Sequence, residues 1–205
     1  SNGFVFTGYE WGDPGDVAVP ADLDGDDRTD IVVYRPTEGN WYAINSGSGA
    51  SGTTQFGQPG DIPLVFDAEG DGTDNFAVFR PAENNWYIAR ATGVPSQNFD
   101  AIPFGIAGDR IVQGDFDGDS RTDVAVFRPT IGQWIIRKSS DLSVGFINFG
   151  VASDVPVVGD YDGDGEDDIA VFRNGIWYVN RSTTGLEVRN FGLSTDTAVA
   201  SLFSH

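Results

Sequence analysis

Four short segments of the chain concentrate carboxylates at a spacing that suits a hard cation. If the first Asp of each segment is position 1, then positions 3 and 5 are acidic, position 4 is Gly and position 9 is Asp or Asn. Alternating carboxylates on a tight loop can point at one centre, and Ca²⁺ takes roughly six to eight oxygen ligands at about 2.3–2.6 Å. The segments therefore predict calcium sites, with side chains at positions 1, 3, 5 and 9 and the main-chain carbonyl at position 7 as ligands.

The predicted ligands follow this numbering in every loop. They are, in chain order, Asp22, Asp24, Asp26, Arg28 and Asp30; Asp67, Glu69, Asp71, Thr73 and Asn75; Asp115, Asp117, Asp119, Arg121 and Asp123; Asp160, Asp162, Asp164, Glu166 and Asp168. The second loop carries less ligand charge, because Glu69 is one methylene longer than Asp and Asn75 is uncharged. The sequence therefore predicts three strong Ca²⁺ sites and one weaker site.

Segments rich in Asp and Gly also form ordinary turns, so a turn without metal is the alternative interpretation. Crowded carboxylates would then repel one another with no compensating cation, which favours the metal. Position 12, where a helix-loop-helix calcium sensor has Glu, is Val33, Val78, Val126 and Val171. Each loop therefore leads into a strand, and because the loop recurs in every repeat, a stabilising role is favoured over a regulatory switch.

Three markers recur along the chain with one period. The loops begin at Asp22, Asp67, Asp115 and Asp160, which are 45, 48 and 45 residues apart. An aromatic-glycine pair runs in phase with them, at Trp11-Gly12, Phe56-Gly57, Phe104-Gly105, Phe149-Gly150 and Phe191-Gly192, and a tryptophan follows each loop, at Trp41, Trp86, Trp134 and Trp177. Repeats of this length are typical of propellers and repeat arrays.

Each repeat contains four short apolar segments bounded by turn residues. The segment after each loop is β-branched or aromatic, as at residues 31–34 and 124–127, and no segment has a sustained helical period. Four short strands in about 45 residues are typical of a propeller blade. The sequence therefore predicts an all-β, β-propeller-like array of four four-stranded blades. The single domain, 1–205, divides into repeats at about 12–57, 58–105, 106–150 and 151–192, with terminal strands at 3–11 and 197–203.

The repeat resembles the FG-GAP/VCBS family, which includes the repeats of integrin α-subunit heads and of many bacterial extracellular proteins. The resemblance rests on the Asp loop with its strand, as in DFDGDSRTDVAVFRP from Asp115, combined with the aromatic-glycine segment, and it covers roughly residues 11–200. It implies calcium in the Asp loops, blades around a central axis, and adhesion or ligand binding outside the cell. It does not imply one ligand.

The composition restricts the classes of partner and chemistry. The formal charge is −19, and Lys138 is the only lysine, which argues against a nucleic-acid partner because phosphate binding needs clustered Lys and Arg. No cysteine occurs, so disulfides and zinc thiolate sites are excluded. No apolar run reaches the roughly 18 residues of a membrane-spanning helix, so we expect no membrane insertion. Bound cations would offset the repulsion among the acidic groups.

Two further sets of residues recur once per repeat. Arg35, Arg80, Arg128 and Arg173 end the strand after each loop. A substrate clamp is one interpretation, but periodic recurrence favours ion pairs with repeat aspartates such as Asp16 and Asp61. The tryptophans and the Phe of each aromatic-glycine pair are similarly interpreted as wedges between sheets, with a glycan-stacking platform as the alternative.

Catalytic groups are scarce in the sequence. The only histidine is His205, so no Ser-His or Cys-His pair can form. Carboxylate pairs of the glycosidase kind are available, but nearly all lie in the predicted calcium loops, where metal-bound oxygens cannot act as general acids. We therefore expect no enzyme activity.

Two functions from different classes remain. The first is a secreted or cell-surface, calcium-stabilised binding or adhesion module that recognises an extracellular glycan or protein. The second is a self-assembling structural subunit of a surface filament or layer, joined through its terminal strands. Unpaired strand edges are templates for pairing between molecules. The array could also close on itself or form part of a larger propeller.

Overall fold

The chain folds entirely into antiparallel β-structure over the part that the structure describes. The computed structural model describes residue 8 and residues 10–199, and these contain strands and turns but no helix. It therefore also has no helix there that could cross a membrane. The strands form four separate four-stranded sheets, each with its strands in sequence order from one edge to the other. The predicted all-β class and the predicted number of strands per repeat are confirmed.

Each sheet lies within one predicted repeat. The strands are β1 (Val17–Ala18), β2 (Ile31–Arg35), β3 (Asn40–Ile44) and β4 (Ser51–Gln55) in the first sheet, β5 (Ile62–Phe66), β6 (Asn75–Arg80), β7 (Asn85–Ala89) and β8 (Phe99–Pro103) in the second, β9 (Arg110–Gly114), β10 (Asp123–Arg128), β11 (Gln133–Arg137) and β12 (Val144–Asn148) in the third, and β13 (Val155–Gly159), β14 (Asp168–Arg173), β15 (Ile176–Arg181) and β16 (Gly185–Asn190) in the fourth.

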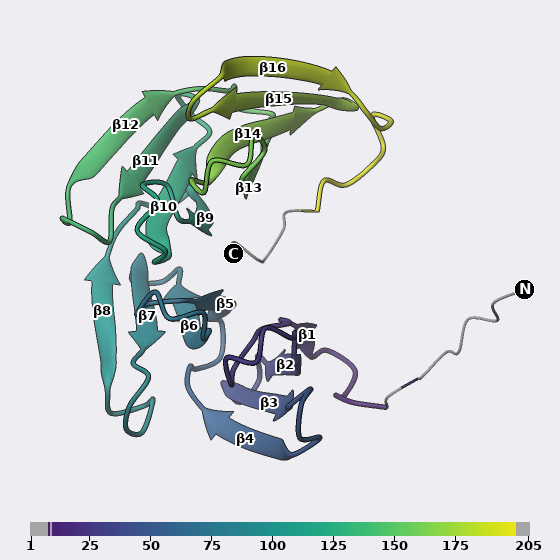
Figure 1. Ribbon diagram of the computed structural model, residues 1–205, viewed down its shortest axis with the longest axis vertical. Helices are drawn as coiled ribbons and strands as arrows, with labels where there is room; N and C mark the ends of the chain where they lie inside the picture. The colour runs from purple at the N-terminus through teal and green to yellow at the C-terminus, as the bar shows by residue number, and fades with distance from the viewer. Residues whose placement is uncertain (1–7, 9, 200–205) are drawn as a thin grey trace, which may run out of the picture.

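The sheets stand side by side in an open arc, with β1, β5, β9 and β13 inside and β4, β8, β12 and β16 outside (Figure 1). The arc differs from a closed propeller, since the first and fourth sheets lie apart. The terminal strands predicted at 3–11 and 197–203 are not seen at residues 8, 10, 11 and 197–199, none of which is in a strand. The other residues of those two segments lie outside the described part of the chain.

Apolar side chains on facing sheets form the core. The face of a sheet that packs against the next sheet along the chain is called its front face. The opposite face, which packs against the preceding sheet, is called its back face. Between the second and third sheets, for example, Phe79 and Trp86 of the front face pack against Val124 and Val126 of the back face. Trp41, Trp86 and Trp134 are all 0% exposed, so they are core residues, as predicted, and cannot form a sugar platform. Trp177, on the last sheet, is half-buried.

The aromatic-glycine pairs link each sheet to the following one. The indole N–H of each repeat tryptophan donates to the carbonyl of the aromatic residue, as from Trp134 to Phe149 at 3.0 Å. The aromatic-glycine segment also lies close to the hairpin between the second and third strands, because a Cβ on the hairpin residue Gly175 would lie 2.6 Å from the carbonyl oxygen of Gly192. Gly175 also has a φ of 82°, which a side chain would disfavour. The main chain can therefore cross between sheets without a gap in the core.

The repeat arginines hold this crossing in place, as the sequence predicts. Arg80 donates through Nε and Nη2 to the two oxygens of Asp61, both at 2.9 Å, and the Asp61 side chain is 1% exposed. The same bidentate pair recurs as Arg35–Asp16, Arg128–Asp109 and Arg173–Asp154. The bond to Arg35 lowers the pKa of Asp16. These arginines are therefore structural, because each is bonded to both oxygens of its partner carboxylate.

Replacing the buried partner of one pair should destabilise the fold substantially. In Asp61→Asn, Arg80 keeps its charge but loses the carboxylate, so we expect the free energy of unfolding to fall by about 2–4 kcal/mol. Urea denaturation followed by tryptophan fluorescence measures the change. The matched control is Asp13→Asn, because the Asp13 side chain pairs with Arg35 but is 68% exposed. The control should cost less than about 1 kcal/mol, and equal losses in the two variants would contradict the assignment.

Candidate metal centres

Each Asp loop folds around the carboxylate of its first residue. In the third loop, Asp115 Oδ1 accepts from the main-chain N–H of Gly118 at 2.7 Å, and its Oδ2 accepts from Ser120 at 2.7 Å. Asp22, Asp67 and Asp160 accept the equivalent bonds in the other loops. Glycine at position 4 suits this turn, since Gly118 has a φ of 72°. The loop shape is therefore encoded locally, by residues close in sequence.

The carboxylate at position 9 connects the loop to the hairpin between the third and fourth strands. Asp123 is 1% exposed, and it accepts from the N–H of Phe116 at 3.0 Å and of Ser139 at 2.6 Å. Asp30 accepts the same two bonds from the N–H groups of Leu23 and Ser46. Asp168 accepts them from the N–H groups of Tyr161 and Ser182. Position 9 is thereby held beside position 1.

Positions 1, 3 and 9 converge in three of the loops. One carboxylate oxygen from each residue lies within 4.8 Å of the others in the groups Asp22, Asp24 and Asp30; Asp115, Asp117 and Asp123; and Asp160, Asp162 and Asp168. This spacing fits one ion about 2.3–2.6 Å from each oxygen. These are the loops in which the sequence predicts the strong sites.

Two of these groups contain a buried oxygen that suits a metal. The Asp117 side chain is 8% exposed, and its Oδ1 has no hydrogen-bond partner within the described residues. The Oδ1 of Asp162 is in the same condition. A buried carboxylate oxygen left without a partner is costly, and a bound cation would remove that cost. The other oxygen of Asp117 is used, since it accepts from the hydroxyl of Ser140 at 2.5 Å.

Positions 5 and 7 lie on the side of the loop that faces the hairpin. The Ser139 hydroxyl donates to Asp119 at 2.9 Å, and that of Ser182 to Asp164 at 2.6 Å, which lowers the pKa of Asp164. In the first loop, the Ser46 hydroxyl lies 3.4 Å from Asp26 Oδ1 and 3.5 Å from the carbonyl oxygen of Arg28. In the first loop, the side chain at position 5 and the carbonyl at position 7 thus lie near one serine hydroxyl.

The serines are site residues that the sequence analysis missed. The available signal was their co-occurrence with position 9. In the repeats with Asp at position 9, Ser46 and Ser139 lie two residues after the last residues of β3 and β11, and Ser182 directly follows β15. The repeat with Asn75 has Ala91 at the corresponding place. In that second loop the N–H of Ala91 lies 3.4 Å from Glu69 Oε1 instead. The second loop is therefore built differently, in line with its predicted weaker site.

Neighbouring loops are bonded to each other through positions 1 and 8. Asp167 donates its N–H to the carbonyl of Asp115 at 2.6 Å, and its carboxylate accepts from the N–H of Asp115 at 2.9 Å. Asp74 with Asp22, and Thr122 with Asp67, make the same reciprocal pair. Each of the first three Asp loops is thus attached to the next sheet, so an ion bound in one of them would also stabilise the contact between sheets.

Burial and charge crowding change the titration of several carboxylates. Burial raises the pKa of Asp74, Asp123 and Asp167 to about 6. Burial also raises the pKa of Asp168. These groups belong to, or bond with, the loops that carry the carboxylate clusters. A nearby cation would favour their ionised forms.

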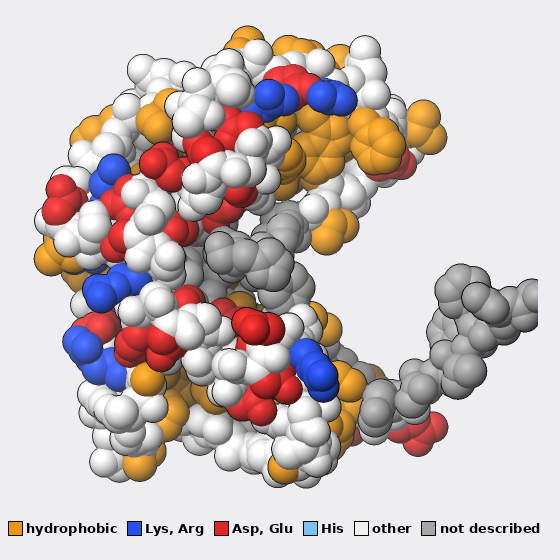
Figure 2. All heavy atoms as spheres, viewed as in Figure 1, with side chains coloured by type: hydrophobic (Ala, Val, Ile, Leu, Met, Phe, Trp, Pro, Cys, Tyr) orange, Lys and Arg blue, Asp and Glu red, His pale blue; other side chains and the backbone are white. Residues whose placement is uncertain are grey.

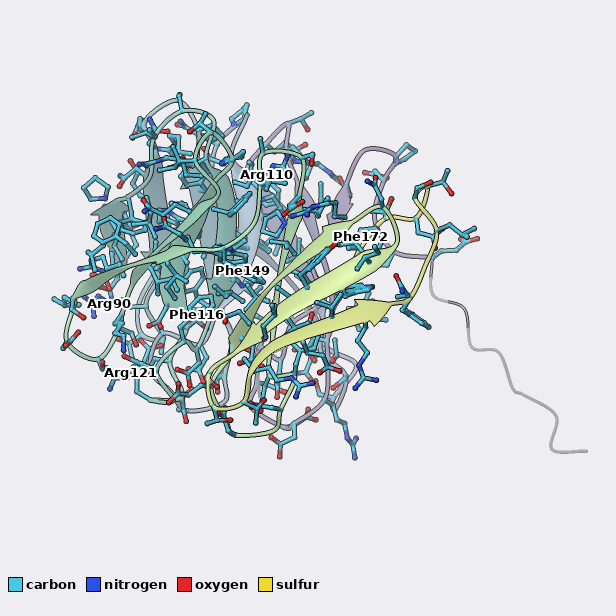
Figure 3. The ribbon with its side chains drawn as sticks, turned by 90° about the horizontal axis from the view of Figure 1, so that it is seen from above. Arg90, Arg110, Phe116, Arg121, Phe149 and Phe172 are labelled. Atoms are coloured by element: carbon cyan, nitrogen blue, oxygen red, sulfur yellow. The ribbon has the colours of Figure 1, made fainter. Side chains whose placement is uncertain are left out.

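Many acidic side chains lie on the face of the molecule that Figure 2 presents. Figure 2 shows them as a curved band that follows the arc of sheets. Figure 3 shows Arg121, in the third loop, and Arg110, at the start of β9, at opposite ends of the sheets. A polar hollow of about 350 Å³ lies where the first three loops meet, lined by residues that include Asp22, Asp67 and Asp115. The first three loops therefore share one polar hollow.

Comparison with solved structures shows that this fold is that of β-propeller proteins. The chain is similar to a lectin of Agrocybe aegerita, solved for its recognition of non-reducing terminal N-acetylglucosamine, with a TM-score of 0.56, 18% identity, and 85% of this chain and 52% of the lectin covered. It is also similar to virginiamycin B lyase from Staphylococcus aureus, with a TM-score of 0.58, 10% identity, and 92% and 59% covered. The fold thus serves both binding and catalysis.

The chain spans only about half the length of these proteins, between 52% and 59%. No protein-family model and no curated protein sequence matches it. The resemblance to FG-GAP/VCBS repeats therefore stays a prediction from the motifs.

The pKa shifts predict a pH dependence of stability in the metal-free protein. Asp74, Asp123 and Asp167 have a raised pKa of about 6, against an ordinary value of 3.8, so the folded state binds more protons between these values. The free energy of unfolding should therefore fall as pH rises from about 4 to about 7. The carboxylates with a lowered pKa, such as Asp16, titrate below this window. Urea denaturation in chelator across this range measures the effect.

Calcium should oppose this fall, because the metal binds the ionised carboxylates. The Asp123→Asn variant, measured in chelator, should show a shallower pH dependence than the parent protein. Stability that rises with pH across the window in chelator would contradict the assigned shifts.

Proposed function

We propose that this protein is a calcium-stabilised β-propeller-type binding module that acts outside the cell, as a secreted or surface protein, and recognises a glycan or a protein. The observation that carries the metal assignment is the recurring convergence of three carboxylates, with the unpartnered Asp117 Oδ1 buried among them. The oxygen-only donor set suits a hard cation such as Ca²⁺ and not a thiolate-binding or imidazole-binding metal.

The role of the metal follows from where the loops lie. Each loop joins two strands of one sheet and is bonded to the neighbouring sheet through positions 1 and 8. Bound calcium would neutralise the crowded carboxylates there and hold adjacent sheets together. An affinity of about 10⁻⁴–10⁻³ M, as in other extracellular modules, would keep such sites filled only where calcium is abundant. Sites of that affinity would suit a location outside the cell.

Calcium titration tests the metal assignment directly. Calorimetry on the protein stripped by chelator should detect three sites in the range of about 10⁻⁴–10⁻³ M and a weaker fourth from the second loop. Calcium at ten times the dissociation constant should stabilise the fold by about 1.4 kcal/mol per site, measured by urea denaturation. No binding, or no stabilisation, would overturn the proposal.

A single substitution should remove one site. Asp117→Asn keeps the size of the side chain but removes the charge from the third group, so the number of strong sites should fall by one. The matched control is Asp141→Asn, an exposed aspartate in the neighbouring hairpin that accepts from its own turn at Ser143. The control should bind calcium like the parent protein.

The binding role is supported by the fold and by the exposed surfaces. The lectin similarity concerns a protein of the same fold that binds a sugar, and this chain carries exposed aromatic side chains outside its core, such as Phe146 at 64% exposure. A glycan array and a pull-down from extracellular material, each with millimolar calcium and with chelator, test the role. Calcium-dependent capture of a defined glycan or protein is the expected result, and capture that chelator does not affect would argue against a calcium-stabilised site.

One observation favours the second candidate, a self-assembling subunit of a surface filament or layer. The four sheets form an open arc, so the front face of the last sheet and the back face of the first are not covered by each other (Figure 1).

A further inference from the structure

The front face of the last sheet is covered only in part. Val157, Ala170, Phe172 and Val179 on this face are buried, and Ala198 packs against them, but the aromatic residue at its edge differs from its equivalents in the other repeats. Phe56 is 4% exposed and Phe149 is half-buried, but Phe191, the equivalent aromatic residue of the fourth repeat, is 78% exposed. A hollow of about 910 Å³ lies on this face, lined in part by Tyr161, Trp177 and Val179. Figure 2 shows hydrophobic side chains gathered on the inner side of the last sheet, at the opening of the arc.

The first sheet presents the matching back face. Val124 and Ile169, which the preceding sheets cover, are both 3% exposed. Ile31 holds the equivalent position after the first Asp loop and is 37% exposed. Val33, on the same face, is 8% exposed, and the indole N–H of Trp11 donates to the carbonyl of Tyr42 in this sheet. Phe191 and Ile31 are therefore the exposed parts of the two opposite halves of one kind of interface, which occurs three times inside the chain.

The first and last loops each have main-chain groups without a hydrogen-bond partner among the described residues, and these groups are complementary. Positions 1 and 8 of consecutive loops bond reciprocally at the three internal interfaces. Over the described residues, the N–H and carbonyl of Asp160, at position 1 of the last loop, have no hydrogen-bond partner. Thr29, at position 8 of the first loop, likewise has none in the described part of the chain. The carbonyl of Asp160 thus lacks a donor, and its N–H lacks an acceptor. The N–H and the hydroxyl oxygen of Thr29 could supply them.

The glycines at position 4 repeat this arrangement. A Cβ on Gly25, Gly70 or Gly118 would lie within 3.2 Å of the side chain at position 7 of the next loop, which is Thr73, Arg121 or Glu166. Gly163, in the last loop, has nothing within 4 Å. The corresponding position 7 on the other end of the array is Arg28, which is exposed. Gly163 and Arg28 are thus the two positions that would meet if another interface of this kind formed.

We infer that the front face of the β13–β16 sheet binds the back face of the β1–β4 sheet of a second copy of this chain, head to tail. The interface would repeat the three internal ones, with Asp160 bonded to Thr29 and Phe191 packed beside Ile31. Two copies joined at both ends make a ring of eight sheets, twice the four of one chain. Propellers close with roughly four to eight blades. The inference gives the assembly candidate a specific interface, and it does not depend on the glycan or protein ligand.

Docking requires one aromatic-glycine segment to replace another. At the internal interface, a Cβ on Gly150 would contact Phe127 on one side and Val171 on the other, at 3.3 and 3.2 Å. A Cβ on Gly192 would lie near Phe172, which corresponds to Phe127, and a Cβ on Gly12 near Val33, which corresponds to Val171. The two terminal segments therefore lie against the two opposite sides of the place that Gly150 occupies between sheets.

Residues 191–196 of one copy would displace residues 11–16 of the next copy. Asp196 would then replace Asp16 as the carboxylate bonded to Arg35. Asp196 already has the required turn, since its Oδ2 accepts from the N–H of Leu193 at 2.9 Å, as Asp154 does from Val151. Its Oδ1 has no partner among the described residues, whereas every other repeat aspartate of this kind is held by an arginine. An arginine from a second copy would complete the set.

Sedimentation of the full chain in millimolar calcium, from micromolar to submillimolar concentration, tests the inference. The parent protein should associate. Phe191→Arg blocks the front face, and Ile31→Arg blocks the back face, so each variant alone should be monomeric. An equimolar mixture should form a one-to-one dimer, because each variant supplies the face that the other lacks. A mixture that stays monomeric, a parent that stays monomeric, or association that survives in either variant would overturn the inference.

Milder variants keep the test decisive if an arginine substitution disturbs folding. Thr29→Ala and Asp196→Asn alter groups without hydrogen-bonded partners across sheets in the described part of the chain, so the melting temperature of the dilute monomer should not change. Association should weaken by about tenfold or more in each. Phe146→Arg, on the outer strand β12, and Thr130→Ala, in an exposed turn, are the matched controls and should associate like the parent. Unchanged association in both Thr29→Ala and Asp196→Asn would also overturn the inference.

Calcium titration separates this inference from the proposed function. A monomer that still binds calcium and gains stability from it would refute the docking and leave the calcium-stabilised module intact.

Discussion

The structure depends on the crowding of carboxylates at the ends of four adjacent sheets. The chain carries a formal charge of −19, and its loops bring three aspartates within 4.8 Å of one another in three places. Main-chain amides satisfy many of these oxygens, which is why each loop closes so tightly around its first aspartate. They do not satisfy all of them, and the buried Oδ1 atoms of Asp117 and Asp162 are where a cation would have the most effect.

The same loops also connect the sheets. Positions 1 and 8 bond reciprocally across each internal interface, while the paired arginine and aspartate of each repeat hold the aromatic-glycine crossing at another part of the sheet. Between these two fastenings, tryptophan and valine side chains exclude water. A change at the loops is therefore expected to affect the stacking of sheets more than the pairing of strands within one sheet. A metal ion bound in these loops would be coupled to the array of sheets for this reason.

A repeat array with an identical contact between all units must end in two unlike, complementary faces. Closed propellers bury these faces against each other, because the last blade meets the first. In this chain the four sheets form an open arc, and Phe191 and Ile31 at its two ends are both exposed. The exposed ends follow from the number of repeats and the angle between neighbouring sheets, and they are the part of the molecule where it differs most from its internal interfaces.

The sequence by itself determined the features that arise within one repeat. The strands, the Asp loops and pairs such as Arg80–Asp61 involve residues less than about 20 positions apart, so their spacing could be read directly. The grouping of positions 1, 3 and 9, with position 5 turned to a serine such as Ser139, was decided by the hairpin that folds back over the loop. The bonds between Asp115 and Asp167 join residues 52 positions apart, and the exposure of Phe191 depends on what lies across the arc. The spacing within a repeat does not show which positions of different repeats meet, because that depends on how whole sheets pack against each other.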